Sequence, residues 1–225
     1  MDWFCETQVA QFISMTDFSV DSVTEIQHGL ECAISERLLE NIVLKTEEQI
    51  DIRTRKYGVS ALLMGEMGYY NPSFIMEYLC KNVKRGRLLR KMPASPAFIY
   101  DFDQAGNLSR VINNDLHLTT YVVHHITTDI CISVSNAEKD IVSIIFCLKD
   151  DLGRTSKWIQ FRWYCQMKVA YGMGAELYQY TDAENTCITF SGISDGHGIL
   201  LGVARNKYRF EINPGGKISS LEYIE

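Results

Sequence analysis

The sequence predicts an α+β protein in which an N-terminal helical segment covers a strongly curved, meander-like antiparallel β-sheet or partial barrel of about ten strands. Apolar residues recur every three or four positions in the first part of the chain and every second position after the prolines of Met92–Pro96. Strand-sized runs then follow one another too closely for crossover helices, so consecutive strands are expected to pair antiparallel. We therefore expect residues 1–91 to be helical and residues 92–225 to form the sheet, together as one co-folded domain.

The helical segment contains signals for four helices. Ser22 and Glu25 form a capping box at the start of a long amphipathic pattern of about six turns with one buried stripe. Asn71 followed by Pro72 is typical of a helix start, because asparagine caps the first turn and proline is tolerated at the first helical position. The four helices are predicted from Ser22 to Ile42, from Thr46 to near Gly58, from Ser60 to Met67 and from Asn71 to Gly86.

Short turns that end in glycine are predicted between the strands of the sheet segment. Alternating aromatic residues lead into Asp103–Gly106, which predicts a type I turn closed by a glycine able to adopt a positive φ. The same pattern recurs at Asn213–Gly216, and Asp150–Gly153 predicts a third turn of this kind. These corners favour hairpins between neighbours in the sequence.

Composition and charge exclude several classes of protein. The 225 residues are 46% hydrophobic and 22% charged, which is ordinary for a globular protein. A net charge of −6 gives no general attraction to nucleic acid or to an anionic membrane. No apolar run approaches the roughly 18 residues of a membrane span, and the first residues lack a basic region typical of secretion signals. We therefore expect a cytoplasmic protein that binds neither nucleic acid nor membranes.

Metal sites are not predicted. The seven cysteines are scattered without a C-x-x-C pair, which argues against a zinc ribbon and against a disulfide framework. Asp101–Gly106 resembles the start of a calcium loop, but Ile112 stands where that loop needs a glutamate. His124 and His125 are adjacent in a predicted strand and must point to opposite faces.

Catalytic and cofactor motifs are also not predicted. The chain has no G-x-S-x-G nucleophile elbow. Gly172 and Gly174 fit neither a Walker A loop nor a dinucleotide fingerprint. His197, between two glycines, is the histidine expected on a flexible loop, where a carboxylate such as Asp195 would be needed to orient it as an acid or base.

Acidic and aromatic residues are the candidates for binding a partner. Residues 1–52 contain eleven acidic and two basic side chains, a balance of −9. Strand alternation places Trp158 and Tyr164 on one face of the sheet and Trp163 on the other, so part of this aromatic group is expected near the surface. Aromatic anchors within a charged rim are typical of protein interfaces. The candidate partner-binding residues are Trp158, Trp163, Tyr164, Glu36, Glu40 and Glu47.

The stretch Lys84–Pro93 running into Phe98–Asp103, with its echo in Tyr208–Ile212, resembles small β-rich bacterial proteins of the toxin-immunity type. This resemblance implies a cytosolic, acidic, single-domain protein that occupies the active site or an exosite of a partner toxin, often a basic nuclease. It implies no catalytic residue and no cofactor. The acidic first part of the chain would suit such a partner through charge steering.

Three hypotheses about function follow from the sequence. The first is a non-enzymatic protein-binding module, in particular an immunity protein that neutralises a basic toxin domain. The second is a curved sheet or barrel that holds an apolar small molecule, for which a pocket would be the deciding feature. The third is a hydrolase whose acid and base, for example His124 or His197, come together only in the fold.

Overall fold

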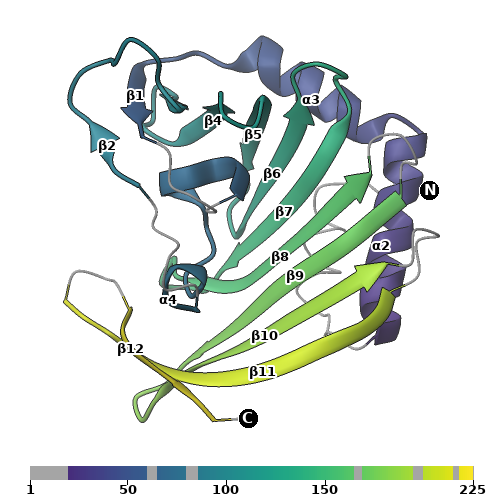
Figure 1. Cartoon of the computed structure of the whole chain (residues 1–225), viewed down its shortest axis with the longest axis vertical. Helices are drawn as coiled ribbons and strands as arrows, with labels where there is room; N and C mark the ends of the chain where they lie inside the picture. Colours follow the sequence, from purple (N-terminus) through teal and green to yellow (C-terminus); the bar gives the residue numbers. More distant parts are fainter. Residues whose placement is uncertain are drawn as a thin grey trace.

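The protein is an α+β structure built on one large antiparallel sheet with helices packed against it (Figure 1). The computed structural model describes residues 20–59, 65–79, 86–164, 169–194, 200–214 and 218–224. In this part of the chain the sheet has twelve strands in the order β12-β11-β10-β9-β8-β7-β6-β5-β4-β3-β1-β2, and every neighbouring pair is antiparallel. The expected antiparallel meander is confirmed, as an open sheet.

The strand bounds follow the alternating pattern of the sequence. After residue 92 the sheet has ten strands, as expected, and consecutive strands pair in each case. The bounds are β3 Phe98–Phe102, β4 Leu108–Asn113, β5 Leu118–His124, β6 Thr128–Ser135, β7 Ile141–Lys149, β8 Thr155–Tyr164, β9 Val169–Tyr180, β10 Asn185–Ser194, β11 Leu200–Ile212 and β12 Ile218–Tyr223.

Two further strands correct the prediction that residues 1–91 are helical. β1 (Thr54–Gly58) pairs with β3, and β2 (Leu88–Leu89) pairs with β1. The helix predicted from Thr46 to near Gly58 is therefore wrong in its second half. Thr54–Gly58 joins the sheet because its backbone completes the edge of β3, and a tertiary pairing of this kind overrides a weak local helix pattern.

The long first helix is also corrected. The apolar stripe runs through two helices, α2 (Val20–Ser35) and α3 (Leu38–Gln49), which are separated at Arg37. Arg37 adopts the left-handed conformation with φ 60°, which ends one helix and turns the chain before the next. The periodicity gave no sign of this break, because both helices turn their apolar positions toward the same core.

The structure describes only part of each of the remaining two predicted helices. Gly65–Tyr70 forms a 3₁₀ helix, η1, and Met76–Leu79 forms α4. Residues 60–64 and 80–85, which the predictions also covered, lie outside the described residues. Asn71 caps locally by accepting a hydrogen bond from the Ser73 backbone N–H at 2.9 Å, so it starts a turn rather than a long helix.

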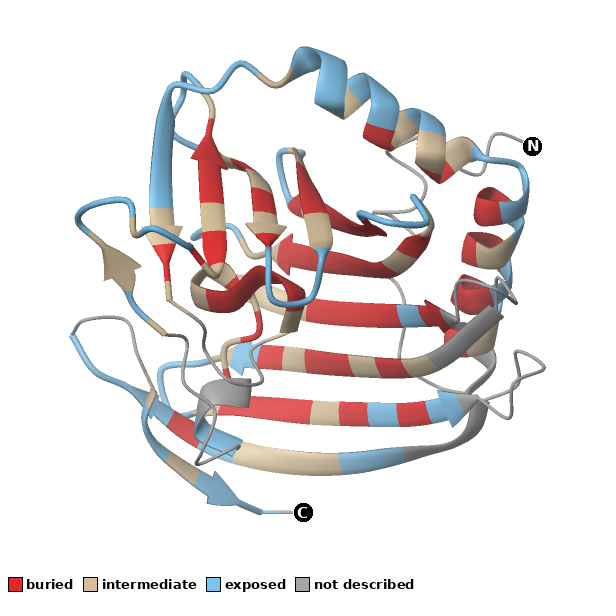
Figure 2. Ribbon diagram, turned by 45° about the horizontal axis from the view of Figure 1, so that its top comes forward, coloured by how far each residue is buried: buried red, intermediate tan, exposed pale blue. Residues whose placement is uncertain are grey.

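The sheet has two differently covered faces (Figure 2). On the first, which we call the helix-covered face, α2 and α3 pack against alternate residues of the central strands and form the largest hydrophobic core, including Leu30, Ile144 and Phe161. On the second, the opposite face, the segment 65–79 packs over smaller clusters that include Tyr100 and Trp158. Among the described residues, no helix is long and apolar enough to cross a membrane.

The predicted turns are confirmed where the structure describes them. Gly106 and Gly153 both have a positive φ, of 87° and 75°, at the ends of the β3–β4 and β7–β8 turns. Asp103 accepts a hydrogen bond from the Asn107 backbone N–H at 2.8 Å, so the sequence Asp101–Gly106 works as a hairpin corner. The remaining predicted turn, at Asn213–Gly216, lies partly outside the described residues.

Candidate functional site

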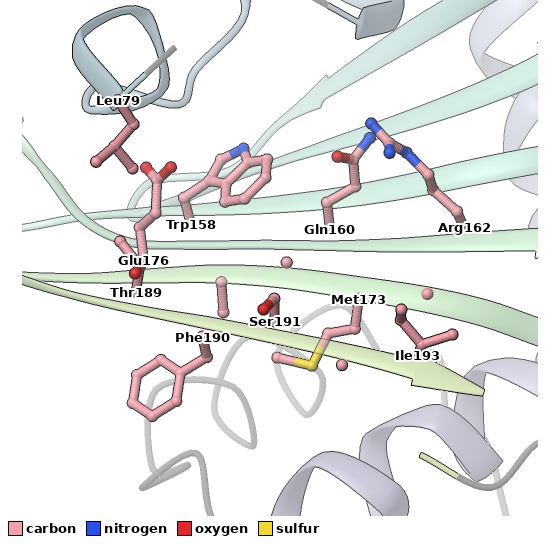
Figure 3. A pocket seen from close by; sticks show the side chains of 14 residues that line it. Leu79, Trp158, Gln160, Arg162, Met173, Glu176, Thr189, Phe190, Ser191 and Ile193 are labelled. Carbon is pink, nitrogen blue, oxygen red and sulfur yellow. The ribbon is translucent and has the colours of Figure 1, made fainter. Parts of the chain in front are cut away.

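A cavity of about 490 Å³ lies on the opposite face of the sheet, over β8, β9 and β10 (Figure 3). Its walls come from side chains of β8 and β10, and Leu79 of α4 closes one end. We call this cavity the trough, because it is open to solvent and follows the direction of β9. Its size lies within the range of small-molecule binding sites.

The strand register places the trough residues in three rows across the sheet. In the first row Glu176 of β9 lies between Trp158 and Thr189. The other two rows have a glycine in the middle. They are Gln160, Gly174 and Ser191, and then Arg162, Gly172 and Ile193.

The trough exists because β9 carries glycine at two successive positions of one face. Side chains alternate along a strand, so Gly172, Gly174 and Glu176 share the trough side while Met173 and Ala175 enter the core on the helix-covered face. The missing side chains leave the backbone of β9 as the floor. Glycine inside a strand is a known mark of close approach by a ligand or another chain.

The two glycines have different surroundings. A Cβ atom at Gly174 would lie 3.3 Å from Cζ3 of Trp158, so the indole packs directly over this glycine. Among the described residues, a Cβ atom at Gly172 would meet only the Gly192 carbonyl oxygen, at 3.8 Å. Packing therefore explains the glycine at 174, whereas the space above Gly172 belongs to the open trough.

A buried carboxylate forms one end of the trough. Glu176 is 3% exposed, and it accepts hydrogen bonds from the Ser73 hydroxyl at 2.6 Å and from the Tyr178 hydroxyl. The Tyr178 oxygen in turn accepts hydrogen bonds from the backbone N–H groups of Phe74 and Ile75, both at 3.1 Å. This network fixes the carboxylate between the sheet and the segment that leads into α4.

The charge of Glu176 affects its neighbours. Burial raises the pKa of Tyr178 well above its ordinary value, and the nearby Glu176 carboxylate raises it further. The pKa of the Cys187 thiol is raised for the same two reasons, burial first and Glu176 second. This end of the trough thus disfavours additional negative charge.

An arginine forms the other end. The Arg162 side chain is 44% exposed, and its Nε atom lies 3.7 Å from Oε1 of the buried Glu66. Gln160 connects the same carboxylate to the sheet, because its Nε2 atom donates to Glu66 at 2.8 Å and to the Ser143 hydroxyl at 3.0 Å. In Figure 3, Glu176 and Arg162 stand at opposite ends of the trough, with Gln160 between them.

The aromatic residues proposed from sequence lie largely in the interior. Trp158 and Trp163 are each 3% exposed, so neither presents an aromatic surface to a partner protein. They do lie on opposite faces of the sheet, as alternation predicted. The backbone of Tyr164 ends β8, and its side chain lies outside the described residues.

The predicted acidic residues lie on or beside α3. Glu36 and Glu47 are exposed, and Glu40 is half-buried and pairs with Arg37 at 2.6 Å. Glu40 and Glu47 also line a second cavity between α3 and β4–β6, on the helix-covered face. The structure therefore does not bring these carboxylates together with the tryptophans.

The histidines do not enter the trough in the part of the chain that the structure describes. His124 pairs with Asp129, Nδ1 to Oδ1 at 2.7 Å, and its Nε2 lies 2.8 Å from the Leu108 carbonyl oxygen. Asp129 also pairs with Lys149 at 2.6 Å. Within the described residues, no group of three histidine, cysteine or acidic side chains is arranged to hold a metal ion. His197 and Asp195 lie outside the described residues.

Comparison of this chain with protein-family models, with curated proteins and with solved structures finds no match. The resemblance to proteins of the toxin-immunity type thus rests on the sequence stretches given above. The candidate site rests on the geometry of the trough alone.

Sequence reasoning missed this site, although a signal was present. Gly172 and Gly174 fit no phosphate-binding or dinucleotide-binding motif, so motif matching gives them no role. The informative feature is their spacing of two within a strand, with core residues Met173 and Ala175 interleaved. That spacing predicts a strand with one bare face, which is a floor for a ligand.

Proposed function

We propose that this is a non-enzymatic binding protein whose trough holds a small organic molecule. The observation that carries the proposal is the space above Gly172, which no described side chain fills, on a strand whose residues Met173 and Ala175 pack into the core on the other face. Glycine inside a strand lowers the free energy of unfolding by roughly 0.5–1 kcal/mol relative to alanine. An alanine would fit at this position without a close contact, so occupation of the space by a ligand explains the glycine.

The composition of the walls supports a mixed polar and apolar ligand. Trp158, Ile193 and Leu79 supply apolar surface, while Gln160 and Ser191 supply hydrogen-bonding groups. Small-molecule sites combine these two kinds of group in this way, with apolar walls for affinity and a few polar groups for orientation.

The trough chemistry favours binding over catalysis. Its lining, among the described residues, includes neither histidine nor cysteine. The His124–Asp129 pair, which has the geometry of an acid–base couple, belongs to the β5–β6 hairpin and not to the trough. A hydrolase would need such a couple beside the bound molecule.

Saturation-transfer NMR with a library of small polar fragments tests this function. We expect fragments that bind the wild-type protein and lose binding in Gly172→Val, because the valine side chain occupies the trough. Ser220→Val, on the exposed strand β12, is the matched control and should bind the same fragments as wild type. Binding that persists in Gly172→Val, or a library without any binder, would contradict the proposal.

A second candidate function, a protein-binding module of the immunity type, is favoured by the exposed part of α3 beside the second cavity. Leu44 is 56% exposed there, and it is flanked by the exposed carboxylates of Glu47 and Glu48. An exposed leucine with an acidic surround suits a basic protein partner. The test is isolation of a partner from the native host in a complex of defined stoichiometry. The double variant Leu44→Lys, Glu47→Lys should lose this complex, whereas Gly172→Val should retain it.

A further inference from the structure

Resting on the proposed function of the trough, we propose that its ligand is an uncharged, flat ring compound whose ring N–H donates a hydrogen bond to Oε1 of Gln160. The ring stands over Gly172, between the side chains of Arg162 and Ile193. The proposal rests on a hydrogen-bond acceptor that is fixed and unused, on the pairing of the charges in the trough, and on the shape of its floor.

Gln160 presents its amide oxygen in a fixed orientation. The residue is 6% exposed and lines the trough. Its Nε2 atom donates to Oε2 of Glu66 at 2.8 Å and to the Ser143 hydroxyl at 3.0 Å, which uses both amide hydrogens. The reversed amide would place its oxygen against the Glu66 carboxylate, where two acceptors repel each other. Because the nitrogen is directed to Ser143 of β7, Oε1 lies on the side away from that strand.

This oxygen is an acceptor that a ligand can reach. Among the described residues no group donates a hydrogen bond to it, and it does not belong to the unpartnered polar atoms that the fold seals from solvent. Figure 3 shows the oxygen turned toward Trp158 and the nitrogen turned toward Arg162. A ligand that displaces solvent from such an acceptor without donating to it loses affinity. The ligand therefore carries a hydrogen-bond donor at this point.

The charged residues of the trough already have partners within the protein. Glu176 is 3% exposed and is held by the Ser73 and Tyr178 hydroxyls. Arg162 pairs with the buried Glu66. A charged ligand would lose its hydration beside these groups without gaining a new ion pair, and that loss is unfavourable. The ligand is therefore uncharged, and its donor belongs to a neutral group.

The shape of the trough at Gly172 suits a flat ring. Arg162 and Ile193 flank this glycine on β8 and β10, whose backbones lie roughly 9–10 Å apart because neighbouring strands are about 4.8 Å apart. The planar guanidinium of Arg162 can stack on an aromatic face while it pairs with Glu66, and Ile193 offers apolar contact on the opposite side. Gln160 lies two residues from Arg162 along β8, so it meets the edge of such a ring, where a ring N–H lies.

The test compares flat rings with and without the N–H donor. The probes are 2-pyridone, 2-quinolone and uracil, each paired with its N-methylated form and with a form methylated at a ring carbon. Saturation-transfer NMR and isothermal titration measure binding to the full chain. We expect the N–H rings to bind and N-methylation to weaken binding by about tenfold or more, whereas methylation at carbon keeps the donor and should change binding by less than about threefold. Gly172→Val should abolish binding of the N–H rings.

Two variants assign the acceptor. Gln160→Met keeps the length of the side chain but removes the oxygen, so it should bind N–H and N-methyl rings equally. Gln179→Met, at an exposed glutamine of β9, is the matched control and should keep the wild-type preference for the N–H rings. Circular dichroism checks that each variant folds. The comparison of N–H and N-methyl rings uses the wild-type protein, so it decides the proposal even if Gln160→Met does not fold.

The outcomes separate the ligand class from the proposed function. If fragments bind in a manner sensitive to Gly172→Val, but N–H and N-methyl rings bind equally or fail to bind, the function stands and the ring proposal is wrong. The same conclusion follows if the tightest-binding fragments carry a net charge. If no fragment and no ring responds to Gly172→Val, the proposed function itself is wrong.

Discussion

At the scale of single residues, the two glycines of β9 differ in what surrounds them. Gly172→Ala places its methyl group in open space on an ordinary strand backbone, and it should stabilise the protein by about 0.4–1 kcal/mol, because it restricts the unfolded chain. In Gly174→Ala the new methyl group forces the buried Trp158 indole to move by a few tenths of an ångström, and it should destabilise the protein by about 1 kcal/mol.

Urea denaturation of the two variants measures this difference in the free energy of unfolding. The sign of the change should differ between positions 172 and 174 although the substitution is the same. A loss of stability at Gly172 equal to that at Gly174 would show that the space above Gly172 is filled by protein, and it would contradict the description of the trough.

Asp101 is a buried acidic residue that forms ion pairs with two arginines. Its carboxylate is fully buried and pairs with Arg55 at 2.6 Å and with Arg110 at 2.8 Å. Asp101→Asn leaves two guanidinium groups without their shared carboxylate, and it should lower the free energy of unfolding by about 3 kcal/mol. This value is at the lower end of the range for breaking a buried ion pair, because Arg55 is partly exposed. Chemical denaturation measures this cost.

The matched control for Asp101 is a surface pair. Glu184 and Arg209 lie 2.7 Å apart, but both side chains are more than 40% exposed. Glu184→Gln should therefore change the free energy of unfolding by less than about 1 kcal/mol. If both substitutions lowered the free energy of unfolding equally, burial would not strengthen the ion pairs of Asp101 with Arg55 and Arg110.

At the scale of elements, the junction of α2 and α3 depends on one backbone conformation. Arg37 has φ 60°, which costs a non-glycine residue about 1 kcal/mol or more. We expect Arg37→Gly to be more stable than Arg37→Ala by about 1 kcal/mol. At Lys45, which is exposed inside α3, the order should be reversed by a similar amount. Thermal denaturation of the four variants tests both orders, and an alanine preference at position 37 would contradict the junction geometry.

The β5–β6 hairpin contains a pH-dependent contact. The hydrogen bond to Asp129 raises the pKa of His124 above its ordinary 6.5, with burial acting in the opposite direction. A raised pKa in the folded state means that protonated His124 stabilises the fold. That contribution is complete below pH 6.5 and is lost as the pH rises through the raised value.

Urea denaturation at a series of pH values from 5.5 to 9 measures this effect. The free energy of unfolding of His124→Gln should lack the part of the decrease above pH 6.5 that wild type shows, because glutamine does not titrate. Ser220→Val, which changes no titratable group, serves as the control and should keep the wild-type dependence. Identical pH profiles for His124→Gln and wild type would contradict the assignment.

At the scale of the whole molecule, the sequence predicted the sheet better than the helices. Alternation and glycine-closed turns such as the one at Gly106 depend on local geometry, so they predicted a meander of about ten strands after residue 92, where the structure describes ten. The break at Arg37 and the strand β1 depend on tertiary context. Arg37 is an unusual residue for a left-handed turn, and β1 exists through its pairing with β3.

The candidate site required three strands to be placed in register. The alternation of Gly172 and Gly174 with core residues was readable in the sequence. The positions of Arg162 and Ile193 beside Gly172 depend on the lengths of the β8–β9 and β9–β10 connections and on their bulges, which residue patterns do not give. Burial of Trp158 depends on segment 65–79, which crosses the opposite face from far away in the sequence.

The central claim is that a ligand binds over the glycine floor of β9. The most direct measurement is a ¹H–¹⁵N correlation spectrum of the full chain, titrated with the tightest-binding fragment. The account predicts that the largest shifts are at the amides of Gly172 and Gly174 and at the Trp158 indole. Shifts concentrated instead at Leu44, Glu47 and Tyr121, on and below α3, would contradict it.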